Sequence, residues 1–347
     1  MAVTTSVRVV DAGRLRATVA GMFRAVGLAD GEATFMGECL VDADLRGVHS
    51  HGTRYAVSYA RGMQSGSINP HPTMQLVRDR HATGLLDADR AMGHIAARRA
   101  MELAIEKARV YGVGTVAVRN STHCGALAYF TQLAADAGCI GFASTNAGSR
   151  MIPWGGRDPI IQLNPLSWAA PTDRPWSINL DMATSVAAGS KITMAIERGE
   201  KIPLGWALDA DGNPTDDPAE ALKGVMLPVG GPKGYGLSVC LDLITGIQAG
   251  GRFGKGLGGP GAAHVLQAND IEAFRPLDEF RADVGRIIDQ IKGSALAPGS
   301  EGIFLPGEIE WNRQQERVRS GIPLTAIVVE GIEQAARELG VETALDV

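Results

Sequence analysis

The chain has 347 residues, enough for about two domains of the usual ~100–200 residues. Hydrophobic residues make up 45% and charged residues 20%, a globular composition that excludes a disordered, fibrous or coiled-coil protein. The net charge is −5, from 33 lysines and arginines against 38 aspartates and glutamates. No stretch is basic enough to follow a phosphate backbone, so we expect no nucleic-acid partner.

Membrane, export and disulfide signals are missing from the sequence. No run of about 18 apolar residues predicts a membrane span. The N-terminal residues lack the pattern of a signal peptide, and we expect a cytoplasmic protein. The cysteines have no CxxC spacing, which predicts neither a zinc site nor a disulfide framework. Each is expected to be a buried free thiol: Cys39, Cys124, Cys139 and Cys240.

Helical patterns fill the first seventy residues, and mixed patterns follow an extended connector at residues 68–72. Helices are predicted over residues 15–27, 35–47, 55–63, 95–110, 126–137, 184–198 and 237–247. Strands are predicted over residues 112–118, 139–144, 160–170 and 176–180. Amphipathic segments follow at residues 278–292, 308–319 and 324–339. This order is typical of an α/β or α+β protein, with a mobile glycine-rich loop at residues 250–261.

One glycine pattern matches a dinucleotide fingerprint only by its letters. Residues 112–117 read GVGTVA, which fits G-x-G-x-x-A. That fingerprint must follow a strand and open a helix, so that backbone amides face the pyrophosphate. Here the pattern follows a predicted helix and opens a strand, so we interpret it as a chance match.

A second glycine-rich segment is better placed to meet a phosphate. Residues 230–236 read GGPKGYG and precede an apolar helix. Glycines let backbone amides approach an anion, a helix N-terminus favours negative charge, and Lys233 adds a positive charge. The segment fits either a phosphate site at Lys233 and Gly234 or a plain tight turn.

Polar residues crowd the loop of residues 44–52, DLRGVHSHG. A histidine beside a serine, near Arg46 and Arg54, fits a proton donor next to an anion site, because imidazole exchanges protons near pH 7. His49 and His51 with an aspartate could instead bind zinc, although such HxH pairs usually lie on a strand. A helix-capping loop with surface histidines is the third interpretation.

Two further polar segments follow predicted strands. Residues 120–125, NSTHCG, lie between a strand and a helix, where α/β proteins often bind ligands. His123 could polarise a carbonyl, move a proton, pair with a Cys124 nucleophile or be purely structural. In residues 177–185, SINLDMATS, the strand ends in Asp181, which could orient a histidine, accept a ribose hydroxyl or start a helix.

Together these segments resemble the malate/L-lactate dehydrogenase family of non-Rossmann NAD(P)-dependent oxidoreductases. The matching strings occur in the family's order between residues 43 and 323: ADLRGVHSHG, NSTHCG, STNA, LNPLSWAAP, LDMATS, IPLGWALDADGNPTDDPAEAL, GGPKGYG, LPGE and RSGIPL. The resemblance implies an α/β (α+β) fold with a helical N-terminal region, residues 1–72, joined by C-terminal helices, residues 308–347. A largely antiparallel cofactor domain would span residues 73–307.

The resemblance also implies NAD or NADP as cofactor, a small carboxylate substrate, a homodimer and no metal. His51 and His123 would face the substrate, and either one would exchange a proton. Family likeness places these residues at the cofactor: Asn146, Ala147, Asp181, Met182, Ala183, Lys233, Gly234, Pro306, Gly307 and Glu308.

Two positions depart from the family's pattern. The family usually has arginine where this chain has Tyr55, so either Arg54 or Arg46 is expected to hold the substrate carboxylate. A small polar residue often follows the STN string, where this chain has Ala147. Any cofactor contact at that position would use the backbone.

The expected reaction is reversible hydride transfer between nicotinamide C4 and C2 of a 2-oxo acid. His51 would donate a proton to the carbonyl oxygen, and Ser50 and His123 would position or polarise the carbonyl group. Arg54 and Asp181 complete the catalytic candidates. A cyclic imine carboxylate is an alternative substrate. A non-catalytic nucleotide-binding protein, or a metal hydrolase using His49 and His51, is an alternative function.

Overall fold

A seven-stranded mixed sheet forms the centre of the protein, whose computed structural model describes residues 6–346. The strand order is β2-β3-β4-β14-β5-β8-β9, and every neighbouring pair is antiparallel except β3 with β4. The predicted α/β class with a largely antiparallel sheet is confirmed. The strands are β2 Gln75–Arg80, β3 Thr83–Asp87, β4 Val113–Ser121, β5 Cys139–Thr145, β8 Leu166–Ala170, β9 Ile178–Met182 and β14 Ala262–Asp270.

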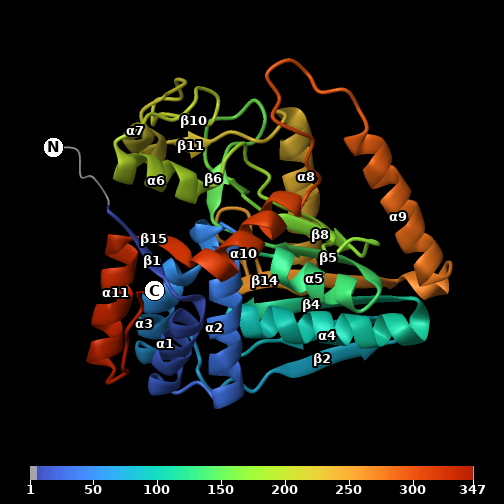
Figure 1. Cartoon of the computed structure of the whole chain (residues 1–347), viewed down its shortest axis with the longest axis horizontal. Helices are drawn as coiled ribbons and strands as arrows, with labels where there is room; N and C mark the ends of the chain where they lie inside the picture. The colour runs from blue at the N-terminus through green and yellow to red at the C-terminus, as the bar shows by residue number, and fades with distance from the viewer. Residues whose placement is uncertain (1–5, 347) are drawn as a thin grey trace.

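Helices cover both faces of this sheet, and the central strand β14 shows why. Successive side chains of a strand point to opposite faces. Leu266 and Ala268 pack in the large core with α4 and α5, whereas Val265 packs with Leu241 of α8 in a smaller cluster. Figure 1 shows α4 and α5 lying along the sheet. The covering elements are α4 Gly93–Tyr111, α5 Ala128–Asp136, α8 Pro232–Asp242 and the π-helix η3 Leu243–Ile247.

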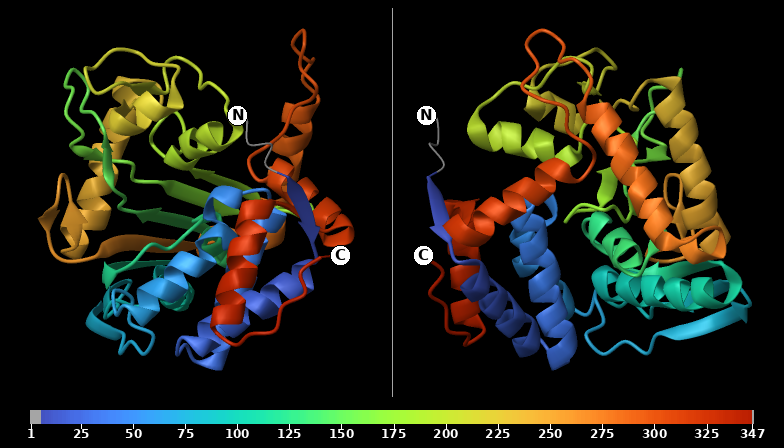
Figure 2. Two further views of the ribbon diagram at one scale, coloured as in Figure 1. Left: turned by 90° about the vertical axis from the view of Figure 1, so that its left-hand side faces the viewer. Right: turned by 45° about the vertical axis from the view of Figure 1, so that its right-hand side comes forward.

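The two ends of the chain pack together beside this sheet. β1 pairs with β15, and residues of both chain ends share one buried core with α4 and α5. Figure 2 shows the first and last elements on the same side of the molecule. The domain boundary predicted near residue 72 stays a prediction. The buried core continues from the residues before this position to those after it. These elements are β1 Val7–Val10, α1 Ala12–Ala25, α2 Asp30–Leu45, η1 His49–His51, η2 Thr53–Tyr55, α3 Ala56–Gln64, α10 Glu308–Ser320, β15 Ile322–Thr325 and α11 Ala326–Glu338.

A smaller four-stranded sheet, of order β10-β11-β6-β7, packs with α6 and α7 around a core of its own. The glycine-rich segment of residues 250–261 contains a short hairpin, β12 with β13. These elements are β6 Ser149–Met151, β7 Ile161–Gln162, β10 Ala207–Leu208, β11 Val225–Met226, α6 Gly189–Arg198, α7 Pro218–Lys223, β12 Arg252–Phe253 and β13 Leu257–Gly258. Two further elements, η4 Ile271–Ala273 and α9 Leu277–Lys292, follow the central strand β14.

Several sequence predictions need correction. The helix predicted over residues 184–198 begins only at Gly189, because the amides of Thr184 and Val186 bond to distant carbonyls of Leu163 and Leu227. The strand predicted over residues 160–170 is two strands, β7 and β8. The amphipathic segment predicted over residues 324–339 starts with the last two residues of β15 and continues as α11 from Ala326. The strands β2, β3 and β14 were not predicted.

The cysteine prediction is correct for three thiols and wrong for one. Cys39, Cys124 and Cys139 are buried and free, whereas Cys240 is exposed on α8. Its side chain lies on the face of the helix that turns away from the sheet. Across residues 6–346, no helix has the length and apolar character that a membrane crossing requires.

Candidate active site

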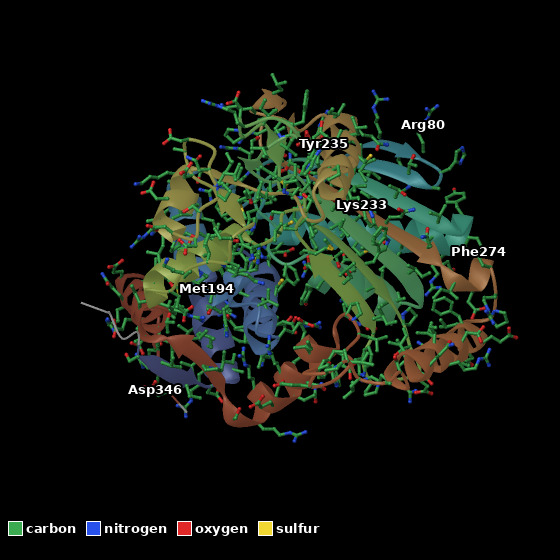
Figure 3. All side chains as sticks on the ribbon, turned by 90° about the horizontal axis from the view of Figure 1, so that it is seen from above. Arg80, Met194, Lys233, Tyr235, Phe274 and Asp346 are labelled. Atoms are coloured by element: carbon green, nitrogen blue, oxygen red, sulfur yellow. The ribbon has the colours of Figure 1, made fainter. Side chains whose placement is uncertain are left out.

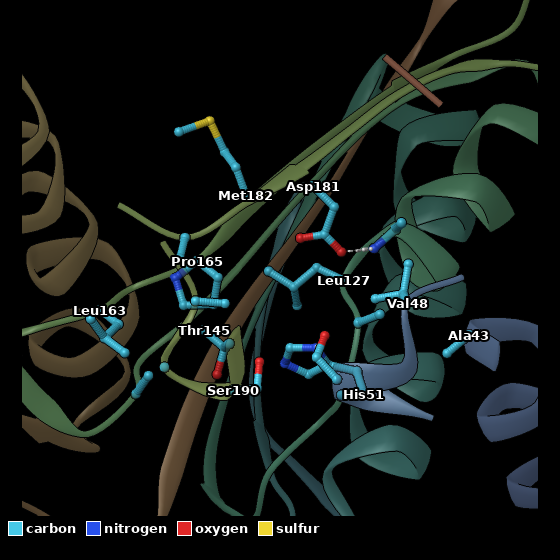
Figure 4. Close-up of a pocket in the computed structure, with 18 of the residues that line it drawn as sticks. Ala43, Val48, His51, Leu127, Thr145, Leu163, Pro165, Asp181, Met182 and Ser190 are labelled. Atoms are coloured by element: carbon cyan, nitrogen blue, oxygen red, sulfur yellow. Dashed lines mark hydrogen bonds between the residues drawn. The ribbon is translucent and has the colours of Figure 1, made fainter. Parts of the chain in front are cut away.

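A cavity of about 690 Å³ lies where the loop after α2, the loop after β4, the end of β9 and the start of α6 meet. This volume is within the range of small-molecule sites. Figure 4 shows His51, Thr145, Asp181, Met182 and Ser190 around it. Most of the predicted site residues line the cavity: Ser50, His51, Arg54, His123, Asn146, Ala147, Asp181, Met182, Ala183, Pro306 and Gly307.

Three predicted cofactor residues do not line this cleft. Lys233 is exposed at the start of α8, and Figure 3 shows it well apart from Met194 of α6. Gly234 is buried in the same turn. The Glu308 carboxylate accepts a 2.5 Å hydrogen bond from Lys292 and a 3.1 Å bond from the Leu305 amide. The structure therefore gives Glu308 a role in holding its own loop.

The turn that carries His51 is held by the buried carboxylate of Asp44. The Asp44 carboxylate accepts hydrogen bonds from His49 Nδ1 at 2.8 Å, from the Thr53 amide at 2.8 Å and from the Thr53 hydroxyl at 2.6 Å. Arg317 of α10 donates to His49 Nε2 at 3.0 Å. Both ring nitrogens of His49 are thus engaged, which leaves no lone pair for a metal. No group of three metal-binding side chains exists within residues 6–346.

His51 lies at the cleft with one ring nitrogen bonded to its neighbour. The Ser50 hydroxyl and His51 Nδ1 are 2.9 Å apart, and the His51 ring stacks on His123 with centroids 5.7 Å apart. Burial, and then the charge of Arg54, lower the pKa of His51 below its ordinary value. The free protein therefore holds His51 mostly neutral at pH 7.

His123 exposes its ring to the cleft, and its Nδ1 lies 2.5 Å from the Tyr59 hydroxyl. Because the cleft is deep in the protein, burial lowers the pKa of His123 to about 4. The adjacent Cys124 is fully buried, and burial raises the pKa of its thiol to about 12. A nucleophilic cysteine must be a thiolate, so the Cys124 nucleophile is excluded.

Two more buried histidines pack around the cleft: His94 lines it, and His264 lies behind its wall. His264 is fully buried between the hydroxyls of Thr145, at 2.7 Å, and Ser121, at 2.9 Å. Burial lowers the pKa of His264 to about 3 and the pKa of His94 well below its usual range. Neither was predicted, because their neighbours are distant in sequence.

Asp181 ends β9 and caps the start of α5. Its carboxylate accepts a 2.8 Å hydrogen bond from the Ala128 amide, drawn as a dashed line in Figure 4. Its surroundings in the cleft raise the pKa of Asp181 to about 6, chiefly by desolvation. No hydrogen bond joins it to a histidine in the described part of the chain. Of the predicted roles, the helix-start carboxylate is the one with a structural partner.

Positive charge lines the cleft from two sides. Arg46 forms a 2.8 Å ion pair with Asp42, whereas Arg54 reaches only a 3.5 Å contact with Glu197. Arg150 and Lys191 also line the cleft, and neither has an ion pair or a side-chain hydrogen bond within residues 6–346. Sequence reasoning missed both, because nothing in their neighbouring residues marks them.

The chain matches the family model described as malate/L-lactate dehydrogenase over residues 10–333. It belongs to this family. Malate dehydrogenase of Pyrococcus horikoshii is 37% identical over 343 residues, 95% of each chain. L-sulfolactate dehydrogenase of Methanocaldococcus jannaschii is 37% identical over 321 residues, 90% of this chain and 92% of that one. The crystal structure of malate dehydrogenase from Entamoeba histolytica has a TM-score of 0.94 and 30% identity, covering 97% of this chain and 99% of that one.

The family predicted from the motifs is confirmed. The protein is a dehydrogenase, an oxidoreductase that acts on the CH–OH group of a 2-hydroxy acid, and its family implies a nicotinamide cofactor. The match to dehydrogenases favours this function over the binding-protein and hydrolase alternatives.

Proposed function

We propose that this dehydrogenase oxidises, with NAD or NADP, a 2-hydroxy acid that carries a second anionic group, as malate and sulfolactate do. The observation behind the proposal is the cleft itself, where two neutral histidines lie among three cations: Arg54, which has one 3.5 Å contact with Glu197, and Arg150 and Lys191, which have no ion pair within residues 6–346. One cation is enough to bind a single carboxylate, so additional cations in the cleft favour a substrate with a second anionic group. The named relatives act on malate and sulfolactate, which both have two anionic groups.

The start of α6 fits the phosphates of a nicotinamide dinucleotide. No side chain caps this helix, and the Ser190 hydroxyl is buried without a hydrogen-bond partner in the described chain. Uncapped amides at a helix N-terminus favour an anion, and Lys191 adds a positive charge. The backbone of Met182, the last residue of β9, and of Ala183 after it would meet the rest of the cofactor. When bound, the cofactor supplies or takes the hydride at C2.

The chain's own residues would bind and orient the acid. Arg54 is the cation whose charge acts on His51, so we assign it the C1 carboxylate, by paired hydrogen bonds. Arg150 would hold the second anionic group. His51 would exchange the proton of the C2 oxygen, with Ser50 fixing its ring.

Arg150 is the residue whose replacement tests the substrate class. Arg150→Gln should lower kcat/KM for oxaloacetate about 10–100-fold, the loss expected for a hydrogen bond to a charged group, and leave pyruvate nearly unchanged. Turnover would be followed by nicotinamide absorbance, with NADH and NADPH each tried, on a panel that includes a cyclic imine carboxylate. Arg157→Gln, an exposed arginine that does not line the cleft, is the matched control. An equal loss for oxaloacetate and pyruvate would contradict the assignment, and silence with every substrate would contradict the function.

A homodimer is also proposed, through the outer face of α8 and η3. Leu241 packs on the sheet, whereas Leu243 is 50% and Ile247 46% exposed on the outer side, beside Cys240. A helix that is apolar on every face is normally buried on both sides. A second copy of the chain would cover this face.

The oligomeric state tests this surface. Wild type should be a dimer by light scattering, and the double variant Leu243→Glu, Ile247→Glu should be a monomer, because a dimer would bury both charges without partners. Leu204→Glu, at a 68% exposed leucine outside this face, should stay dimeric. A monomeric wild type, or a dimeric double variant, would contradict the proposal. The cytoplasmic location predicted from the N-terminus stays a prediction.

A further inference from the structure

Tyr59 of α3 lies directly behind His123, although the two residues are 64 positions apart in sequence. Its hydroxyl is 2.5 Å from His123 Nδ1. The Tyr59 ring stacks on Tyr55 with centroids 5.5 Å apart and meets the edge of His94 at 5.6 Å. The side chain is 6% exposed. Packing therefore fixes the phenol in one position against the imidazole.

The direction of this hydrogen bond follows from the number of available partners. Among residues 6–346, His123 Nδ1 is the only hydrogen-bond partner of the Tyr59 hydroxyl. If Nδ1 donated, the buried phenol proton would have no acceptor, at a cost of about 1–3 kcal/mol. Burial also raises the pKa of Tyr59 well above its ordinary range, so the phenol keeps its proton. Tyr59 is therefore the donor and His123 Nδ1 the acceptor.

A neutral imidazole that accepts at Nδ1 carries its proton on Nε2. His123 Nε2 has no hydrogen-bond partner in the described chain, and the ring lines the cleft next to His51. His123 thus presents an N–H group to the cleft. His51 differs, because its Nδ1 partner is a serine hydroxyl, which can either donate or accept. The tautomer of His51 is therefore free to change.

We propose that Tyr59 is a positioning residue that holds His123 as an Nε2–H donor to the C2 oxygen, so that only His51 exchanges the proton. This inference rests on the proposed function for its substrate. In reduction, the C2–H bond would form with the hydride that the reduced nicotinamide supplies from its C4–H bond, the π pair of the carbonyl moves to oxygen, and that oxygen takes a proton from protonated His51. His123 keeps its Nε2 proton throughout and stabilises the negative charge on oxygen. Oxidation runs the same steps in reverse.

The tautomer can be observed without any substrate. Long-range proton–nitrogen NMR of histidine-labelled protein should show His123 with a protonated Nε2 and a bare Nδ1 in wild type, the signals being assigned with His123→Gln. Tyr59→Phe removes the donor and should shift the Nδ1 resonance. Tyr111→Phe removes a half-exposed phenol at the far end of α4 and should leave the His123 signals unchanged. Thermal unfolding of each variant checks that the fold persists.

Kinetics then separate positioning from general damage. Tyr59→Phe should lower kcat/KM about 10–100-fold, the usual cost of removing a partner that orients a functional histidine. Its cofactor dissociation constant and the midpoint of its pH profile should not move, because His51 is intact. A His123 protonated at Nδ1 in wild type, or unchanged nitrogen shifts and rates in Tyr59→Phe, would overturn the inference. If no substrate is turned over, the proposed function fails while NMR still decides the tautomer.

Discussion

Replacing His51 with alanine should lower turnover by ~10²–10⁴-fold, the usual contribution of a general acid or base. Cofactor binding should stay near normal, because the α6 and β9 contacts do not involve this residue. The loss should appear equally in kcat and kcat/KM, the pattern of an interaction made in the transition state. Steady-state kinetics and cofactor titration by tryptophan fluorescence measure both. Equal turnover in the variant would remove His51 from the mechanism.

The pH dependence gives the same residue a second signature. In the proposed mechanism, reduction requires protonated His51, whose pKa is lowered by burial and by Arg54. In wild type, kcat/KM for reduction should therefore rise as the pH falls below 6.5, and kcat/KM for oxidation should fall over the same interval. His51→Ala should flatten both profiles. His81→Ala, at an exposed histidine outside the cleft, should keep the wild-type profiles.

Replacing Asp44 with alanine should lower the free energy of unfolding by ~3–5 kcal/mol, the usual cost of breaking a buried charged network. The Asp44 side chain is 1% exposed, and its removal leaves three donors without their acceptor: the buried amide and hydroxyl of Thr53 and the half-buried ring of His49. The turn that positions His51 should loosen as well, so activity should fall with stability. Chemical denaturation at unchanged m-value measures the stability.

Asp30→Ala is the matched control for this prediction. Asp30 begins the same helix, α2, but its side chain is 81% exposed, and Arg24 is its only side-chain partner among residues 6–346. A surface ion pair contributes about 0–1 kcal/mol. If the free energy of unfolding of Asp44→Ala were within about 1 kcal/mol of the wild-type value, the three donors would have found other acceptors.

Local patterns allowed much of this dehydrogenase to be predicted. The helices α1 and α4 follow from apolar spacing, because each buries one stripe of apolar residues. Helix α2 is buried on most of its surface, and α9 buries only Gly285 and Ile288, although both carry apolar residues at helical spacing. The turn with Ser50 and His51, the loop with His123 and the end of β9 at Asp181 were found as polar segments between elements. Their order along the chain identified the family. Each of these signals lies within a few neighbouring residues, which is the range of turn chemistry and helical periodicity.

Tertiary structure decided which of these residues act together. β14 follows a glycine-rich segment and became the central strand only because β4 and β5, more than a hundred residues earlier, supply hydrogen bonds on both of its edges. The Tyr59–His123 pair and the buried His264 depend on contacts of the same kind. The phosphate site expected at Lys233 lies outside the cleft, while Lys191 and Arg150 line it. The sequence by itself determined which groups are present and the family they belong to. Long-range packing decides which of these groups share a cleft. It also decides their tautomers and charges, because burial and hydrogen-bond partners set the pKa and the protonated nitrogen of each histidine.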